Sequence, residues 1–201
     1  MDEEKSGKGF GAIENVRISI LVLGAQDREN EAGAMKAAIN PRHEVSIFAP
    51  TKTNFFTKFS TAKAVTELKP HVIHALGIKG AAASAMSLAN GSETALVISL
   101  NNEDLSKTSA ATLTRAAKQA GALVVESESE ADQLRALGIK RNIYVTAAPL
   151  LDDTESQRFY LGAIEIVYGR IIDPEKLPEP LMDTDGAPLV SIGGCMKGSD
   201  N

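Results

Sequence analysis

Short apolar runs alternate with longer segments at helical spacing along most of this chain. Three of the runs, at residues 72–75, 96–100 and 123–125, end at small or polar residues. Alternation of apolar, turn-bounded strands with helices is typical of βαβ units in a parallel sheet that is buried on both faces. Ligands of such sheets bind beyond the carboxyl ends of the strands. The residues that follow each run are therefore the first candidates for a functional site.

Six strands and six helices follow from this pattern. The strands are predicted at residues 16–23, 44–48, 72–75, 96–100, 123–125 and 143–145, with a further short edge strand at 189–192. The helices are predicted at residues 31–39, 56–68, 81–89, 109–120, 128–137 and 155–172. This order predicts an α/β fold, a three-layer αβα Rossmann-like domain with a mainly parallel sheet of about six strands in the order 3-2-1-4-5-6.

The spacing within two of the helices predicts which faces are buried. The predicted apolar face of helix 56–68 consists of Phe59, Ala62, Val65 and Leu68. That of helix 155–172 consists of Phe159, Ala163, Ile166, Val167 and Ile171. Ser127 and Glu130 have the spacing of a capping box at the start of helix 128–137. We expect one domain over residues 16–172, between a flexible arm at 1–15 and a Pro/Gly-rich tail at 173–201.

Composition and charge narrow the class of protein. The 201 residues are 43% hydrophobic and 23% charged, as in soluble globular domains. A net charge of −5 argues against sequence-independent binding to nucleic acid or to an anionic membrane. No apolar run approaches the ~20 residues of a transmembrane segment, and the acidic amino terminus is unlike a secretory signal. Cys195 is the only cysteine, so no internal disulfide forms, and we expect a cytoplasmic protein.

Several catalytic motifs are missing from the sequence. The three histidines and one cysteine do not have the spacing of a zinc site. There is no GxSxG elbow, no GxxxxGK[ST] phosphate loop and no GxGxxG after the first predicted strand. These absences disfavour hydrolase, nucleotide phosphatase and dehydrogenase functions, and we expect neither a metal nor a cofactor.

The stretch from Lys69 to Asp152 contains an ordered set of short motifs. It reads KPHVIHALGIKG, then ALVISLNN, then GALVVESESEADQLRALGIKRNIYVTAAPLLD. In this order, over residues 16–152, the motifs resemble the amino-terminal domain of family 4 glycosyltransferases. Those enzymes have the GT-B architecture, in which two Rossmann-like domains face each other across a cleft. The resemblance implies a cytoplasmic glycosyltransferase-related protein, of the type that transfers a hexose from a nucleotide sugar with retention of configuration.

The chain departs from that family after Asp152. Family members continue with a second domain that binds the donor, whereas here a last helix follows within a few residues. That helix contains Val167-Tyr168-Gly169-Arg170-Ile171, which resembles the ending of the family's carboxyl-terminal crossover helix. We therefore expect the acceptor-side half of a transferase, inactive alone and completed by a partner chain with the donor domain. The alternative is a non-catalytic binding or scaffold domain that self-associates as a homodimer.

The first candidate site residues follow the first and third predicted strands. Gly24 and Ala25 stand where the family has a glycine pair beside the donor diphosphate, and a plain strand-to-helix turn is the alternative. Acidic residues follow this loop, which is unfavourable beside a diphosphate unless a metal or a basic group intervenes. His74 stands where the family has a histidine facing the cleft, so it is either a ligand for a sugar hydroxyl or a structural histidine. Gly77 and Lys79 form a loop suited to an anionic ligand or to solvent.

The remaining candidates follow the fourth and fifth predicted strands. Asn101 replaces a histidine that the family uses near the donor, and it cannot carry a proton or a positive charge. With Asn102 it either binds a polar ligand or caps and turns the chain. Glu126 is a candidate to bind an acceptor hydroxyl, while Ser127 is expected to cap a helix. Together these residues predict a site for a nucleotide sugar or a sugar acceptor, without assigning a catalytic residue.

Overall fold

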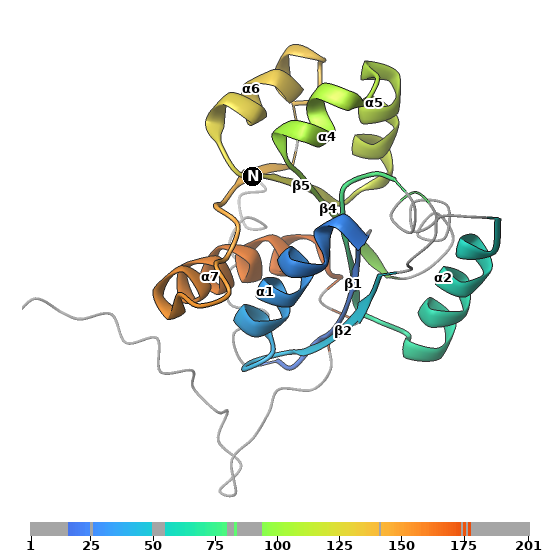
Figure 1. Ribbon diagram of the computed structural model, residues 1–201, viewed down its shortest axis with the longest axis vertical. Coiled ribbons are helices and arrows are strands. Elements are labelled where there is room, and N and C mark those ends of the chain that lie inside the picture. Colours follow the sequence, from blue (N-terminus) through green and yellow to red (C-terminus); the bar gives the residue numbers. More distant parts are fainter. Residues whose placement is uncertain are drawn as a thin grey trace, which may run out of the picture.

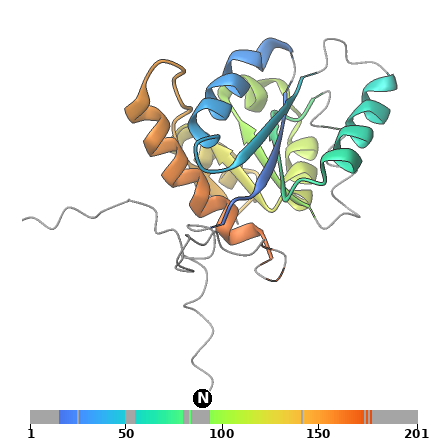
Figure 2. The same cartoon turned by 90° about the horizontal axis from the view of Figure 1, so that it is seen from below.

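The protein has a parallel sheet between two layers of helices (Figures 1 and 2). This computed structural model describes residues 16–24, 26–49, 55–79, 83, 94–140, 142–173, 175 and 177. Every strand of the six-stranded sheet runs parallel to its neighbours. The predicted three-layer αβα Rossmann-like fold is therefore confirmed.

The strand order differs from the predicted one. The strands are β1 (Ser19–Leu23), β2 (Glu44–Phe48), β3 (Val72–Leu76), β4 (Ala95–Leu100), β5 (Ala122–Val125) and β6 (Ile143–Val145), in the order β2-β1-β3-β4-β5-β6. The predicted order 3-2-1-4-5-6 is wrong, because β3 pairs with β1 and not with β2. Both orders bury the same apolar runs, so strand composition does not distinguish them. The topological switch point consequently lies between β1 and β3.

The described helices are α1 (Glu29–Ile39), α2 (Phe55–Leu68), α4 (Asn102–Lys107), α5 (Ala110–Gln119), α6 (Glu128–Ala136) and α7 (Thr154–Ile171). A short 3₁₀ turn, η1 (Gln26–Arg28), precedes α1. Neither η1 nor α4 was predicted, whereas the capping box of Ser127 and Glu130 at the start of α6 is confirmed. The helix predicted at 81–89, apart from residue 83, and the strand predicted at 189–192 lie outside the described residues. So does the arm at 1–15.

Each face of the sheet has its own apolar cluster. Alternate residues of β1, such as Ile20 and Val22, pack against α1 and α7, while Leu21 and Leu23 belong to the cluster on the opposite face. That opposite cluster includes residues of α4, α5 and α6 together with partly buried residues of α2. Figure 1 shows α7 beside α1, far along the chain from it. The last helix therefore packs back onto the sheet.

The buried faces of α7 and α2 differ from the predicted ones. In α7 the inward residues are Tyr160, Ile164, Val167 and Tyr168, whereas Phe159 and Ile166 are exposed. In α2 the buried positions are Thr57 and Thr61, whereas Phe59 and Leu68 are exposed. The Thr61 hydroxyl donates a hydrogen bond to the carbonyl of Thr57 at 2.7 Å, which allows its burial. A hydrophobicity pattern therefore located the helices but not their orientation.

A buried polar contact attaches α7 to the amino-terminal edge of the sheet. Glu165 accepts a hydrogen bond from Arg42 at 3.0 Å, and its other oxygen lies 3.0 Å from Nε2 of the fully buried His43. Because buried polar groups need partners, this contact specifies the position of α7. Among the helices that the structure describes, none combines the length and apolar character needed to cross a membrane.

Candidate functional site

The crevice at the carboxyl ends of the strands is the candidate site. Gly24 follows β1 and Gly77 follows β3, so both lie at the topological switch point. Gly77 has a φ of +77°, and a Cβ atom there would lie 2.9 Å from Oδ1 of Asp104 and 3.2 Å from a guanidinium nitrogen of Arg28. The chain thus needs glycine here, because an ion pair approaches its backbone closely.

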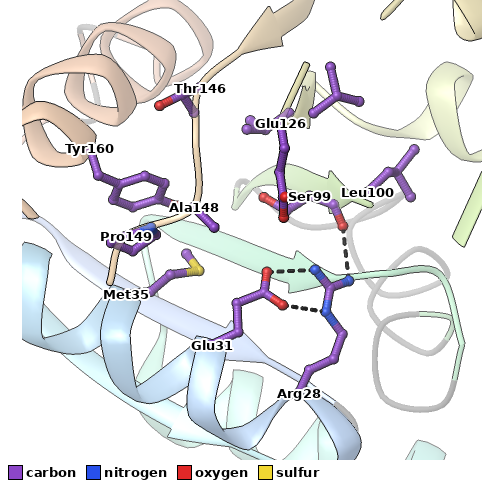
Figure 3. Close-up of a pocket in the computed structure, with 12 residues that line it drawn as sticks. Arg28, Glu31, Met35, Ser99, Leu100, Glu126, Thr146, Ala148, Pro149 and Tyr160 are labelled. Carbon is purple, nitrogen blue, oxygen red and sulfur yellow. Dashed lines mark hydrogen bonds and ion pairs between the residues drawn. The ribbon is translucent and has the colours of Figure 1, made fainter. Parts of the chain in front are cut away.

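Arg28 is the centre of the polar contacts in this crevice (Figure 3). It comes from η1 and donates two hydrogen bonds to the carboxylate of Glu31, at 2.6 and 2.5 Å. A third hydrogen bond reaches Asp104 on α4 at 2.8 Å, and a longer one reaches the carbonyl of Ser99 at 3.4 Å. A fork of this kind is the strongest geometry for an arginine–carboxylate pair. The hydrogen bond from Arg28 to Asp104 joins the segment after β1 to the segment after β4.

The electrostatics of the crevice disfavour an anionic ligand. Burial alone would lower the pKa of Arg28. The hydrogen bonds and charge of Glu31, together with the charges of Asp104 and Glu126, outweigh burial, so that the pKa of Arg28 is raised. Three carboxyl groups thus surround one cation. From the sequence it was open whether a basic group neutralises the negative charge of the acidic residues after β1. Arg28 is that basic group. Its donors are already engaged with Glu31, Asp104 and Ser99, so an incoming diphosphate would meet excess negative charge.

Glu126 is the exposed carboxyl group of the crevice. It follows β5, and its backbone N–H donates to Glu130 within the capping box of α6. Partial burial, with the nearby charges of Glu31 and Glu130, raises the pKa of the Glu126 side chain, while Arg28 opposes the shift. A carboxyl group with a perturbed pKa in a crevice is a candidate for binding or proton transfer.

The crevice is largely filled by its own side chains. Its lining includes Met35 from α1, Tyr160 from α7 and Pro149 from the segment after β6 (Figure 3). These groups leave a volume of about 10 Å³ for a water-sized group. Ligand pockets typically enclose roughly 300–1,000 Å³. The pocket lined by these described residues therefore offers polar groups at its rim and too little enclosed space for a nucleotide.

Asn101 and Asn102 lie at the start of α4. The Asn101 side chain accepts a hydrogen bond from the backbone N–H of Asp104 at 2.9 Å, and the backbone N–H of Asn101 donates one to the Asp104 carboxylate at 3.2 Å. This reciprocal pair is a capping box. Asp104 therefore both caps α4 and binds Arg28, so the end of β4 is coupled to the loop after β1. Asn102 is the first residue of α4 and is exposed.

His74 lies inside the domain, between the sheet and α7. Its side chain is fully buried, with Nδ1 2.7 Å from the Tyr168 hydroxyl and Nε2 2.7 Å from the Ser99 hydroxyl. Burial, assisted by the charge of Arg28, lowers the pKa of His74 to about 3. Both ring nitrogens are therefore engaged within the protein, and the imidazole is neutral at physiological pH. This arrangement corresponds to the structural alternative for His74.

The two remaining predicted site residues are Lys79 and Ala25. Lys79 is exposed in the loop after β3, and Ala25 lies outside the described residues. Sequence reasoning missed Arg28, Glu31 and Asp104. The i,i+3 spacing of Arg28 and Glu31 was a local signal for one ion pair, but no local pattern relates Arg28 to Asp104. Within the part of the chain that the structure describes, no cluster of three or more His, Cys, Asp or Glu residues could hold a metal ion.

Comparison with known proteins gives a fold likeness. No protein-family model matches the chain, and no curated protein matches it significantly. MnaA of S. aureus, in a co-structure with UDP, has a TM-score of 0.52 at 8% identity, over 64% of this chain and 44% of that one. UDP-GlcNAc 2-epimerase from Methanocaldococcus jannaschii has a TM-score of 0.50 at 11% identity, over 64% and 45%. The chain thus spans less than half the length of these GT-B-fold structures, and its described part is similar in fold to one Rossmann-like domain.

Proposed function

We propose that this domain forms the acceptor side of a GT-B-type enzyme that acts on sugar nucleotides, in the manner of a glycosyltransferase. The nucleotide would be bound by a separate donor domain on a partner chain, and the rim of the crevice would bind sugar hydroxyls. The observation that carries the proposal is the charge balance around Arg28, which has three carboxyl neighbours.

That balance favours a neutral, hydroxylated ligand. Sugar hydroxyls donate hydrogen bonds to carboxylates and accept them from other donors, without adding charge to the site. A diphosphate adds negative charge next to Glu31, Asp104 and Glu126, and it would have to displace Glu31 and Asp104 from Arg28. Removing a carboxylate from a buried guanidinium costs the hydrogen bonds of both. The crevice therefore suits the sugar, and the phosphates are better held elsewhere.

The similar solved structures support a sugar-nucleotide context. One is described in complex with UDP and another as a UDP-GlcNAc 2-epimerase. Their likeness extends over a single domain of this chain, and activity comes from residues placed on a fold and not from the fold itself. The transferase chemistry and the cytoplasmic location therefore remain part of the proposal.

The proposal is tested by NMR titration of the ¹⁵N-labelled chain with N-acetylglucosamine, glucose and UDP, each at millimolar concentration. Neutral sugars are expected to shift amide signals around Glu126 and Arg28, and UDP is expected to leave them unchanged. Glu126→Gln should weaken the sugar response. The matched control Glu67→Gln changes an exposed carboxylate on α2 and should leave the response intact. Shifts caused by UDP alone at the crevice would contradict the proposal.

The alternative is a non-catalytic scaffold domain that self-associates through the crevice. The filled state of the crevice, with about 10 Å³ available, is the observation in its favour. In that case sugars cause no shifts, and the signals of Gly24 and Asn101 broaden as the protein concentration rises. A neighbouring reading frame that encodes a lone donor-type domain would instead favour the enzyme.

A further inference from the structure

Two histidine side chains contact the backbone at the amino-terminal end of β1. The backbone N–H of Ser19 donates a hydrogen bond to Nδ1 of His71 at 3.0 Å, and the backbone N–H of Ile18 makes a longer contact, of 3.5 Å, with Nδ1 of His43. His43 directly precedes β2 and His71 directly precedes β3, the two strands that flank β1. A backbone N–H inside a protein needs an acceptor, and at the start of β1 imidazole nitrogens fill this role.

The position of the proton on His71 follows from its hydrogen-bond partners. A backbone N–H can only donate, so Nδ1 of neutral His71 is the acceptor for Ser19 and the ring proton lies on Nε2. The Ser19 hydroxyl lies 2.8 Å from the same Nδ1 and accepts a hydrogen bond from the backbone N–H of His71 at 3.3 Å. A second proton on the ring would occupy Nδ1. The hydroxyl can then accept this proton's hydrogen bond, but the backbone N–H of Ser19 loses its acceptor.

His71 can take up a proton from solvent. It is half-buried and lines a hollow of about 310 Å³, whereas His43 is fully buried. The charged groups among the described residues that line this hollow are Arg17, just before β1, and Glu44 in β2, and Lys69 lies shortly before β3. Burial lowers the pKa of His71 from its ordinary value of 6.5. The ring is therefore neutral at pH 7.5 and becomes protonated as the pH falls below 6.5.

We propose that His71 is a pH-sensitive switch at the start of β1: the neutral imidazole binds the Ser19 N–H, and the protonated imidazole releases it and loosens residues 16–19. The backbone of His71 stays in place, because its N–H donates to the Ser19 carbonyl and its carbonyl accepts from Ala95. The change is therefore confined to the first residues of β1. It lies at the end of the sheet opposite the crevice and does not depend on the proposed function.

The first test follows the ¹⁵N-labelled full chain by NMR from pH 7.5 to pH 5. At pH 7.5 the imidazole spectrum of His71 should show a proton on Nε2 only, with a scalar coupling between Nδ1 and the Ser19 amide nitrogen across the hydrogen bond. This coupling should disappear as Nδ1 gains its proton. A His71 that carries its proton on Nδ1 at pH 7.5, that does not titrate above pH 5, or that titrates while the coupling persists would overturn the proposal.

The second test uses variants and hydrogen exchange of the Ser19 amide. In the wild type, acid should lower the protection of this amide, by up to about tenfold for each unit by which the measured pKa of His71 lies below 6.5. His71→Asn keeps an acceptor oxygen that does not titrate, so it should lose less protection in acid, whereas His71→Leu should leave Ser19 unprotected at both pH values.

His74 does not account for a local change in this range, because its ring in the folded protein stays neutral down to a pH of about 3. Comparison of the wild type with His71→Asn at each pH also cancels the contribution of His74 to global unfolding. Circular dichroism checks that each variant is folded. If folded His71→Asn loses as much Ser19 protection in acid as the wild type, or folded His71→Leu retains it at pH 7.5, His71 is not the switch.

Discussion

Acidification should destabilise this protein through His74. The unfolded chain binds a proton at this residue below a pKa of about 6.5, whereas the folded protein binds it only below about 3. Between these values the unfolded state holds more protons, so the free energy of unfolding falls as the pH falls. The contribution of neutral His74 to the free energy of unfolding is fully present above pH 6.5 and is lost progressively as the pH falls towards 3.

The size of this pH effect follows from the difference between the pKa of His74 in the unfolded and folded states. At pH 5 the unfolded residue is about 1.5 pH units below its pKa, and each unit corresponds to about 1.4 kcal/mol. His74 should therefore lower the free energy of unfolding by about 2 kcal/mol at pH 5 relative to pH 8. Urea unfolding at the two pH values, followed by circular dichroism, measures this difference. Other titrating groups also contribute, so the decisive quantity is the difference between the wild type and a variant.

His74→Gln should lose this part of the pH dependence, because its side chain does not titrate. Tyr168→Phe should behave differently: it removes one partner of the buried imidazole and should cost roughly 1–3 kcal/mol at both pH values. Its pH dependence should remain, since His74 stays buried. If His74→Gln and the wild type lose equal stability between pH 8 and pH 5, the neutral, buried histidine is not the cause and the reasoning is wrong.

Three further substitutions test separate contacts by urea unfolding. Gly77→Ala should destabilise by about 1–3 kcal/mol, because a residue with a Cβ is strained at φ +77° and would lie against Asp104; a neutral effect would contradict the close approach. Glu165→Gln should cost roughly 1–3 kcal/mol, since it removes the carboxylate between α7 and the amino-terminal edge, whereas an effect no larger than that of Glu67→Gln would refute this role. Ser127→Ala should cost about 1 kcal/mol by removing the cap of α6, and an unchanged unfolding midpoint would show that the cap is dispensable.

Local signals in the sequence were sufficient for most of the described elements, although not for η1 and α4, and they did not determine how the elements are arranged. The capping box of Ser127 and Glu130 was predictable because both residues lie within one helical turn. The buried faces of α2 and α7 were not, because they depend on which elements cover each helix. The apolar residues that the pattern assigned to the core of α7 include Phe159 and Ile166, which are exposed.

The candidate site shows the same distinction between local and long-range signals. The strand positions identified the crevice, and Gly77 and Glu126 do lie there. His74 was placed at the end of a strand, but the strand continues to Leu76, and its alternation turns His74 towards the α7 side. Asp104 reaches Arg28 across 76 positions of the sequence, and only the folded sheet brings them together.

The most direct test of the account is calorimetric titration of the isolated chain with UDP-N-acetylglucosamine. The described pocket beside Arg28 has an excess of negative charge and a volume of only about 10 Å³. No binding heat is therefore expected up to millimolar ligand. Tight binding that is abolished by Arg28→Gln in a folded variant, with Lys63→Gln as an unaffected control, would contradict the claim that this domain binds sugar hydroxyls and leaves the nucleotide to a partner.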